Sequence, residues 1–524
     1  MKQFFTTFEE LLDHLAETYP DRIAIRFSPD QPDSVLTYGD LQKEVARRKE
    51  IFSNLSSSIR MEGADKNPDL SNAALVEPGA TVLLTGKTDL NWILNLLGAL
   101  TAGCMAVLSD PLWKADRVRR DWEKTRGPFY PGALLFYTSG TTDKGKAVVL
   151  TQETLLRAAW NGQTMLPCQK EDRLFSVLPL NHVFGFVCAF LWPLTQGAEI
   201  DLGTGLRGLM TDPLKYRPSI LTCVPTLLGL FLKANVLNPE LRVILVGAGP
   251  CNEKLIQAVL AKGIHLRFGY GLTETSSGVA ISMDDSDPYG FVPCPDTSFR
   301  ITEEGELLLK TPCMMQGYYN LPEKTAEKLV DGEFHTGDLA KVDENGNIHI
   351  LGRLKDVIVM PNGEKIFCPE AEDVLQKAMG DSVELALLLV DDQLTLAVRE
   401  KMQEKKEAAA EHFEEKREAI SEKRQERRAA AAEHFEERKE AAKEHLQEQK
   451  ARVAEKIAKK RESREARRTS PEEAVDDWNA NEGLGRKIRK VIYVQEDFPR
   501  TATGKLQRYR LQQLVEEMKA ARGK

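Results

Sequence analysis

The sequence predicts an α/β protein whose large N-terminal domain is built on mainly parallel sheets. Three observations support this class. The chain has 524 residues, more than one hydrophobic core usually serves. Over about the first 350 residues, short continuous apolar runs alternate with helix-like stretches, as in sheets covered by helices on both faces. Finally, residues 401–468 are so rich in charge that they cannot belong to the same core.

The expected strands are short apolar runs, and the expected helices lie between them. In chain order the strands are 81–86, 104–109, 133–137, 174–178, 219–224, 243–246 and 266–268. The helices are 94–102, 154–160, 227–234 and 253–262, and Thr151 is the predicted N-cap of the second helix. Around 290–320 the pattern changes to short strands and turns.

Composition excludes several classes of protein. With 42% hydrophobic residues the chain has enough apolar content for buried cores, so it is not wholly disordered. A formal net charge of −8 argues against a nucleic-acid binder whose whole surface is basic. The eight cysteines form no C-x-x-C pair and fit neither a zinc site nor a disulfide framework, so we expect buried thiols.

Neither the N-terminus nor the longest apolar run predicts a membrane segment. Glu9 and Glu10 come too early for a signal peptide. The apolar run at 92–108 is interrupted by a polar residue and two glycines, so a buried helix followed by a strand fits it better than a membrane span. We therefore expect a soluble, cytoplasmic protein.

The charged segment 401–468 is predicted to be a helical insertion. It holds 21 Lys and Arg and 17 Asp and Glu in 68 residues, with no Gly or Pro, and the sequence AAAEHFEE at 408–415 recurs at 430–437. Its apolar residues follow a period near 11/3, which forms one thin stripe on a helix. We expect a hairpin or bent arm that turns within 420–432. It is either a solvated spacer or a peripheral contact with a membrane or a protein through its basic end, 456–468.

A loop rich in hydrogen-bond donors follows the strand at 133–137. Residues 138–146 hold four hydroxyl side chains, two glycines and two lysines, which can wrap phosphate oxygens. The Walker pattern is absent. Taken alone, the loop fits a phosphate site and an ordinary polar turn about equally well.

Seven motifs along the chain, in one fixed order, make the sequence similar to the adenylate-forming (AMP-forming, acyl-activating) superfamily. This superfamily includes acyl-CoA synthetases, adenylation domains of peptide synthetases, and luciferases. The motifs lie at 136–147, 179–185, 247–250, 270–274, 336–338, 352–356 and 499–505. Together they span the chain except for the charged segment.

The resemblance implies a two-domain architecture and a two-step reaction. An AMP-binding adenylation domain would span 1–352. A small, mobile α+β domain would span 353–524 and carry the insertion, with Lys355 at the hinge and the active site between the domains. A carboxylate would attack the α-phosphate of ATP to form an acyl-adenylate and pyrophosphate, and a thiol would then displace AMP. The implied cofactors and co-substrates are ATP, Mg²⁺ and CoA. No nucleic-acid partner is expected, and the oligomeric state is not predicted.

The resemblance also assigns a role to each matching residue. The β- and γ-phosphates would be held by Thr138, Ser139, Gly140, Thr141, Thr142 and Lys146. Gly247, Ala248 and Tyr270 would bind adenine, and Asp338 with Arg353 would bind the ribose. Thr273 would contact the α-phosphate, and Glu274 would hold Mg²⁺. Lys505 would neutralise charge at the α-phosphate, and His182 would lie on the substrate side.

The sequence departs from the family pattern in the phosphate loop. Asp143 stands where the family usually has Gly, which places an extra carboxylate beside the phosphates. Gly145, Lys146 and Ala147 replace Pro-Lys-Gly.

Several phrases most resemble bacterial long-chain acyl-CoA synthetases, namely 269–275, 359–366 and 498–505. The apolar stretch 183–192 would line an acyl pocket, or it is simply a core helix. A short-chain or aryl acid, and a carrier-protein thiol in place of CoA, remain alternatives. A further alternative is a degenerate nucleotide-binding scaffold with a partner-binding arm.

Overall fold

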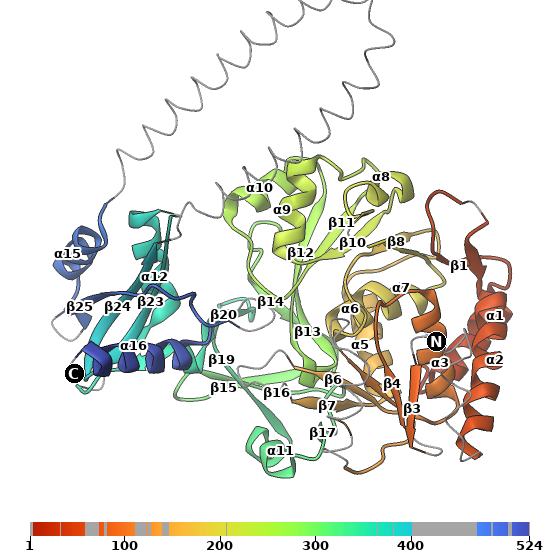
Figure 1. Ribbon diagram of the computed structural model, residues 1–524. Coiled ribbons are helices and arrows are strands. Elements are labelled where there is room, and N and C mark those ends of the chain that lie inside the picture. Colours follow the sequence, from red (N-terminus) through yellow and green to blue (C-terminus); the bar gives the residue numbers. More distant parts are fainter. Residues whose placement is uncertain are drawn as a thin grey trace, which may run out of the picture. The chain divides into compact units, whose positions relative to one another are not determined.

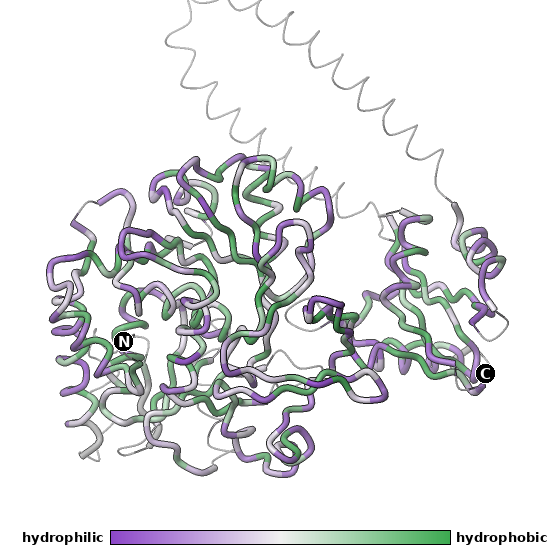
Figure 2. Tube along the Cα trace, turned by 180° about the vertical axis from the view of Figure 1, so that it is seen from behind, coloured by the Kyte–Doolittle hydropathy of each residue, from purple (hydrophilic) through white to green (hydrophobic). Residues whose placement is uncertain are grey.

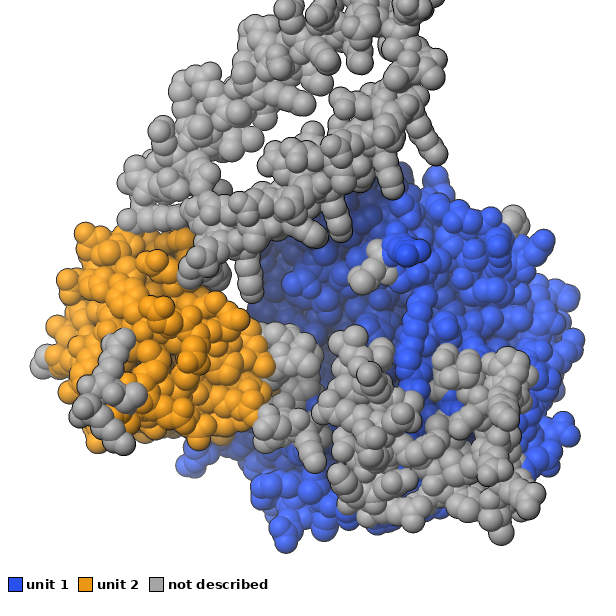
Figure 3. Space-filling model, in the orientation of Figure 1, with its two compact units in different colours: residues 1–351 blue, residues 352–524 orange. Residues whose placement is uncertain are grey.

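The computed structural model divides into two compact units, Met1–Leu351 and Gly352–Lys524 (Figure 3). The division falls one residue before the expected domain boundary. The residues described are 4–31, 33–57, 73–77, 81–109, 122, 127–138, 146–205, 207–362, 364–380, 382–400, 469–483, 486–500 and 506–522. The charged segment 401–468 and its expected turn lie outside them.

The larger sheet of unit 1 is mixed rather than mainly parallel (Figure 1). Its parallel part runs β1 (Ile23–Arg26), β9 (Glu199–Leu202), β8 (Arg173–Ser176), β10 (Ile220–Cys223), β11 (Val243–Val246) and β12 (His265–Leu272), with β2 (Val35–Thr37) antiparallel at its edge. The antiparallel part continues through β13 (Ser277–Ser282), β14 (Phe291–Pro293), β20 (Ile348–Arg353), β19 (Glu333–Val342), β16 (Glu306–Lys310) and β15 (Ser298–Ile301), and β18 (Leu329–Val330) pairs with β19.

A second, smaller sheet carries the predicted phosphate loop. Its order is β17 (Gly317–Tyr318), β7 (Ala147–Leu150), β6 (Leu134–Tyr137), β5 (Met105–Leu108), β4 (Thr81–Leu84) and β3 (Ala73–Glu77). Only β4–β5 and β5–β6 are parallel pairs. The loop joins β6 to β7, which form an antiparallel hairpin.

Strand β11 shows why continuous apolar runs predicted these strands correctly. Val243 and Leu245 face one core, which includes residues of α5 (Gln152–Met165) and the π-helix η3 (Val187–Leu191). Ile244 and Val246 face the other, beneath α9 (Pro225–Ala234) and α10 (Glu253–Leu260). Because both faces are covered, every position of the strand must be apolar. The long central strands are accordingly coloured mainly as hydrophobic in Figure 2.

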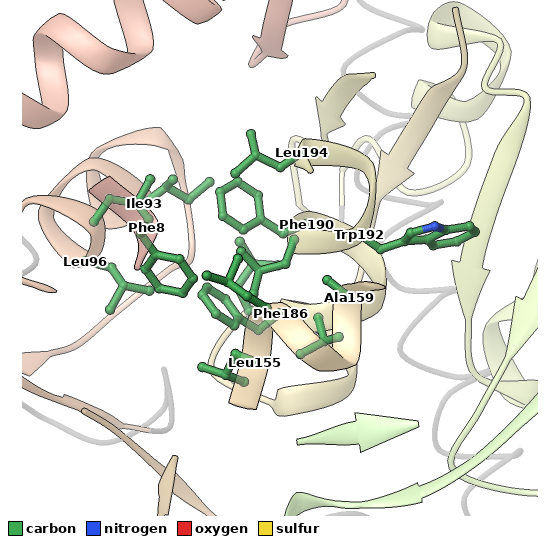
Figure 4. Close-up of a cluster of buried hydrophobic side chains, with 14 of the residues drawn as sticks. Phe8, Ile93, Leu96, Leu155, Ala159, Phe186, Phe190, Trp192 and Leu194 are labelled. Carbon is green, nitrogen blue, oxygen red and sulfur yellow. The ribbon is translucent and has the colours of Figure 1, made fainter. Parts of the chain in front are cut away.

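The first core joins helices that are distant in sequence. Phe186 and Phe190 meet Phe8 of α1 (Phe8–Thr18), Leu155 of α5 and Ile93 of α3 (Leu90–Thr101), and each of these side chains is buried (Figure 4). The predicted helix and strand at 94–109 are confirmed as α3 and β5. Within the described residues, no helix is both long and apolar enough to cross a bilayer. The other helices of unit 1 are α2 (Tyr38–Ser57), α6 (Val183–Phe186), α7 (Trp192–Leu194), α8 (Asp212–Tyr216) and α11 (Pro322–Lys328).

Unit 2 is a small α+β unit. Its sheet pairs β23 (Val383–Val390) with β24 (Gln393–Glu400), and β24 with β25 (Lys490–Tyr493). Helices α12 (Cys368–Met379) and α15 (Pro471–Asn481) share a core with one face, and α16 (Arg508–Arg522) shares a core with the other. A separate hairpin joins β21 (Val357–Val359) and β22 (Lys365–Phe367). Of the eight thiols, seven are buried and Cys188 is partly buried, as predicted.

Candidate active site

The ends of the predicted phosphate loop are joined by two hydrogen bonds. Thr138 N–H donates to the carbonyl of Lys146 at 2.9 Å, and Lys146 N–H donates to Thr138 Oγ1 at 3.2 Å. Ser139, Gly140, Thr141 and Thr142, and the unusual Asp143, lie between these ends and outside the described residues. The loop therefore has a closed base on the β6–β7 hairpin.

The phosphate end of the site contains two charged side chains that contact one tyrosine. They are Lys146 and Glu274, and the tyrosine is Tyr318. Tyr318 O–H donates to Glu274 Oε1 at 2.7 Å. Lys146 Nζ lies 3.8 Å from the centroid of the Tyr318 ring. Burial lowers the pKa of Lys146, and the Glu274 carboxylate opposes this change. The predicted phosphate lysine and the predicted metal carboxylate thus contact one tyrosine.

A tight turn places Thr273 and Glu274 after β12. They lie in the single 3₁₀ turn η4 (Thr273–Thr275), and Thr275 Oγ1 donates to Leu272 and Ser277 carbonyls. A Cβ on Gly271 would lie 1.7 Å from the carbonyl oxygen of Ser277. Only glycine fits there, which explains the Gly of the Tyr-Gly-x-Thr-Glu motif.

The predicted ribose end is a partly buried hydrogen-bonded pair. Tyr270 O–H donates to Asp338 Oδ2 at 2.6 Å, and Asp338 is 3% exposed. Asp338 N–H donates to Thr336 Oγ1 at 3.0 Å, and Thr336 O–H donates to the carbonyl of Leu307. Strands β12 and β19 thereby bring together two of the residues that the sequence predicted.

Glu306 holds the backbone beside Asp338. Its Oε1 accepts from Gly337 N–H at 2.8 Å, and its Oε2 lies 3.0 Å from His335 Nδ1. Gly337 has φ 72°, a conformation that favours glycine. Lys328 Nζ donates to the carbonyl of His335 at 2.8 Å. The part of β19 that carries Asp338 is therefore held by the side chains of Glu306 and Lys328.

The glycine turn at 247–250 packs against the histidine motif. A Cβ on Gly247 would lie 2.6 Å from the Phe184 ring, and Ala248 has φ 67°, in the left-handed region. His182 is exposed and precedes the first residue of α6. The structure thus brings two predicted motifs into contact through Phe184.

A small apolar cavity of about 20 Å³ has lining residues from α5, η3, β11 and β13. Cys188, Trp192 and Leu245 are among the lining residues. The predicted acyl stretch at 183–192 includes the π-helix, and such helices often mark functional sites. The cavity has room for about one water molecule.

The predicted residues of unit 2 are only partly described. Arg353 ends β20, and Lys355 is exposed in the 3₁₀ turn η5 (Leu354–Asp356). Lys505 lies outside the described residues. The base of its loop is closed, because Arg500 and Leu506 form a β-bridge and Gln507 N–H donates to the carbonyl of Pro499 at 2.8 Å.

A third group of titratable residues joins the β19–β20 hairpin to the segment before β14. Asp343 and His349 of the hairpin and Asp287 before β14 place ligand-type atoms within 4.8 Å of one another. Burial would raise the pKa of Asp343, but hydrogen bonds from Asn347, His349 and Asn345 outweigh it and hold that pKa at about 2. Because Asp343 accepts the backbone N–H groups of its own turn, we assign this group to the stability of the hairpin.

Sequence analysis missed Tyr318 and Glu306 as parts of the site. Tyr318 is 44 residues from Glu274, and Glu306 is 31 residues from Gly337. No local pattern records such pairs. Phe184 lies within the histidine motif and the apolar stretch that the sequence predicted, but its contact with Gly247 was not predicted.

Comparison with known proteins identifies the segment that carries most of these residues. Residues 132–319 match the family described as AMP-binding enzyme. Through this segment the chain is similar to the AMP-binding enzyme family. The AMP-binding segment begins just before β6 and ends at Tyr319, so it includes the loop base and the group of Lys146, Tyr318 and Glu274.

Curated relatives of the AMP-binding segment differ in the acid that their names state. The chain is 29% identical over 304 residues to a long-chain-fatty-acid–CoA ligase of Mycobacterium bovis, covering 47% of this chain and 50% of that one. It is 30% identical over 337 residues to a feruloyl-CoA synthase of Amycolatopsis, covering 59% of this chain and 65% of that one. The chain therefore spans between half and two thirds of the length of these relatives.

A solved structure extends the similarity of fold beyond the AMP-binding segment. O-succinylbenzoate–CoA synthetase of Bacillus subtilis, in complex with ATP and magnesium, has a TM-score of 0.68 and 18% identity. It covers 96% of this chain and 98% of its own. This protein therefore shares the fold of that synthetase, with a large α/β domain and a smaller C-terminal domain.

Proposed function

We propose that this protein activates a carboxylic acid with ATP, through an acyl-adenylate, and transfers the acyl group to CoA. The observation that carries the proposal is the gathering of Lys146 and Glu274 around Tyr318, on the same unit as the Tyr270–Asp338 pair. A nucleoside triphosphate with its metal needs a cation for the phosphates, a carboxylate for the metal and a hydrogen-bond acceptor for the ribose. The names of the relatives support an acid–CoA ligase.

The residues present fit Mg²⁺. Magnesium is usually held by one or two carboxylates together with phosphate oxygens and water. Glu274 is partly buried, and Tyr318 O–H binds only its Oε1. Among the described residues, none donates a hydrogen bond to Oε2, so this oxygen is available to a cation. A bound Mg²⁺ would neutralise phosphate charge.

The first step joins two anions, so the protein must supply positive charge and hydrogen-bond donors. Thr138, Lys146 and the hydroxyl side chains between them would hold the β- and γ-phosphates, and Thr273 would hold the α-phosphate. Asp338 and Arg353 would bind the ribose hydroxyls, while Tyr270 and the Gly247–Ala248 turn would bind adenine. Lys505 would neutralise charge that develops at the α-phosphate.

The acid is proposed to be apolar, and a long-chain fatty acid is the specific proposal. The support is the apolar lining of the cavity beside η3 and the name of the Mycobacterium relative. The name of the Amycolatopsis relative supports an aromatic acid instead. Because the cavity has room for only about one water molecule, the side chains that line it would have to move to admit an acyl chain.

The test is ATP–pyrophosphate exchange with a panel of acids, followed by thioester formation with CoA or with a carrier protein. The panel contains short-chain, long-chain and aryl acids. Exchange that rises with long-chain acids supports the fatty-acid proposal, and exchange with aryl acids alone replaces it. Exchange with none of them contradicts ligase activity and favours a nucleotide-binding scaffold, a role that the changed residues of the phosphate loop would suit.

A further inference from the structure

Tyr318 contacts both charged groups of the phosphate end. Its hydroxyl donates to Glu274 Oε1 at 2.7 Å, and the face of its ring lies 3.8 Å from Lys146 Nζ. The residue is only 4% exposed. It is therefore a packed element of the site rather than a mobile surface tyrosine.

The backbone fixes the ring relative to both partners. Tyr318 pairs with Val148 of β7, two residues after Lys146, and Tyr319 N–H donates to the carbonyl of Ala147 at 2.8 Å. On the other side, Met315 N–H donates to the carbonyl of Glu274 at 2.8 Å. The short segment 315–319 is thus hydrogen-bonded to the strand after Lys146 and to the turn of Glu274.

The tyrosine also separates two opposite charges. No ion pair of 4 Å or less joins Lys146 to Glu274, although both belong to the described part of the chain. The Tyr318 hydroxyl instead donates to Glu274, and the face of its ring contacts Lys146 Nζ. A direct ion pair would consume both charges, whereas a ring and a hydroxyl leave each one available to a ligand.

We propose that Tyr318 is a positioning residue that holds Lys146 on its ring and Glu274 on its hydroxyl, and so keeps the phosphate cation and the metal carboxylate apart until Mg·ATP binds. This inference rests on the proposed function. The contacts of Tyr318 with Glu274 and with Lys146 can be tested separately. Tyr318→Phe removes only the hydroxyl, whereas Tyr318→Leu removes both the hydroxyl and the ring.

The experiment measures binding of ATP to the full-length protein by calorimetry, with and without Mg²⁺. Tyr318→Phe should leave metal-free ATP binding within twofold of the unchanged protein. It should raise the Mg²⁺ concentration needed for half-maximal ATP binding by about three- to tenfold, as expected for one lost hydrogen bond. Tyr318→Leu should also weaken metal-free ATP binding by about threefold or more, because Lys146 loses its cation–π support.

Tyr319→Phe is the matched control. Its hydroxyl accepts from Gly127 N–H and its ring stacks on Trp122, so it loses one buried hydrogen bond without contacting Lys146 or Glu274. It should change neither measurement. The inference is overturned if Tyr318→Phe leaves the Mg²⁺ requirement unchanged, or if Tyr319→Phe alters it equally. If the unchanged protein binds no ATP, the proposed function fails first, and the inference fails with it.

Discussion

The two ends of the candidate nucleotide site are built differently. At the ribose end, Asp338 is buried, accepts from Tyr270 O–H, and follows Gly337, whose N–H donates to Glu306. At the phosphate end, Lys146 and Glu274 carry opposite charges and are separated by Tyr318. One end has a carboxylate held by hydrogen bonds among three strands, β12, β16 and β19. The other end holds two charges apart.

We therefore expect the ribose end to control where the nucleotide lies, and the phosphate end to control the response to the charge of the ligand. A buried carboxylate with defined hydrogen bonds selects where the sugar lies, because its acceptor directions are fixed. Separated opposite charges instead respond to the charge of the ligand, which changes when pyrophosphate leaves. Variants at the ribose end should therefore affect nucleotide affinity, while variants at the phosphate end should affect metal and pH dependence.

The largest effect is expected from Lys505→Ala. This variant tests whether the residues of the phosphate end in unit 1 can support pyrophosphate exchange without Lys505. Pyrophosphate exchange should fall by about 10²–10³-fold, because one preorganised charge contact at the α-phosphate is lost. Conversion of preformed acyl-adenylate to thioester should persist. Gly363→Leu is the reciprocal variant: it should leave exchange normal and block thioester formation. Equal damage to both steps in both variants would contradict separate roles for the two residues.

Asp338→Asn should have the next largest effect. The amide oxygen can still accept from Tyr270 O–H, but the charge toward the ribose is lost. The KM for ATP should rise by about 10- to 100-fold, as for a hydrogen bond to a charged group of about 1.5–3 kcal/mol, with the Mg²⁺ requirement unchanged. Steady-state exchange at varied ATP and Mg²⁺ measures both. Asp331→Asn, in an exposed turn with φ 52°, is the control. If Asp338→Asn changed only the Mg²⁺ requirement, the proposed difference between the ribose end and the phosphate end would be contradicted.

Lys146→Arg should produce a smaller effect that depends on pH. Burial lowers the pKa of Lys146, so its positive charge is lost at a lower pH than for an ordinary lysine, and ATP binding should weaken as the pH rises through that value. Arginine stays charged, so the fall in ATP binding at alkaline pH should occur at a higher pH in the arginine variant. The KM for ATP should differ by a few-fold between the variant and the unchanged protein. Lys215→Arg, at an exposed ion pair with Asp30, should leave the pH of this fall unchanged. If ATP binding fell at the same alkaline pH in the unchanged protein and in Lys146→Arg, Lys146 would not control the pH dependence of ATP binding.

The smallest effect is expected from replacing 401–468 with a short Gly-Ser linker. The segment leaves β24 and re-enters at α15, and Val398 and Ala474 beside its two ends belong to one core. A linker can therefore close the path at modest entropic cost. Exchange should stay within about twofold and folding should be retained by circular dichroism. Loss of either would make the segment integral to the site.

The sequence predicted the parallel core well and its antiparallel continuation poorly. Strand β11 was predicted at its observed bounds because both of its faces are buried, and the Thr151 cap of α5 is confirmed. Strand β12 extends to Leu272, beyond the expected 268, because its second half pairs with β13. Short antiparallel strands with one exposed face have interrupted apolar patterns, which a pattern of continuous runs does not detect.

The candidate site shows the same limit in another form. Tyr270, Asp338, Lys146 and Glu274 were predicted because each belongs to a local motif, and the structure pairs Tyr270 with Asp338. Tyr318 and Glu306 were missed because their partners are far away in sequence, on strands whose pairing was not predicted. Residues that contact a ligand can be found through motifs, whereas residues that hold them in place need the tertiary structure.

The contact between Phe184 and Gly247 joins the start of α6 to the glycine turn. The ring occupies the space that any side chain at 247 would need. The helical stretch that begins at Val183 continues into η3, which lines the apolar cavity. If the proposed acid binds in this cavity, a change of acid preference would come from exchanging side chains on this stretch rather than from moving its backbone.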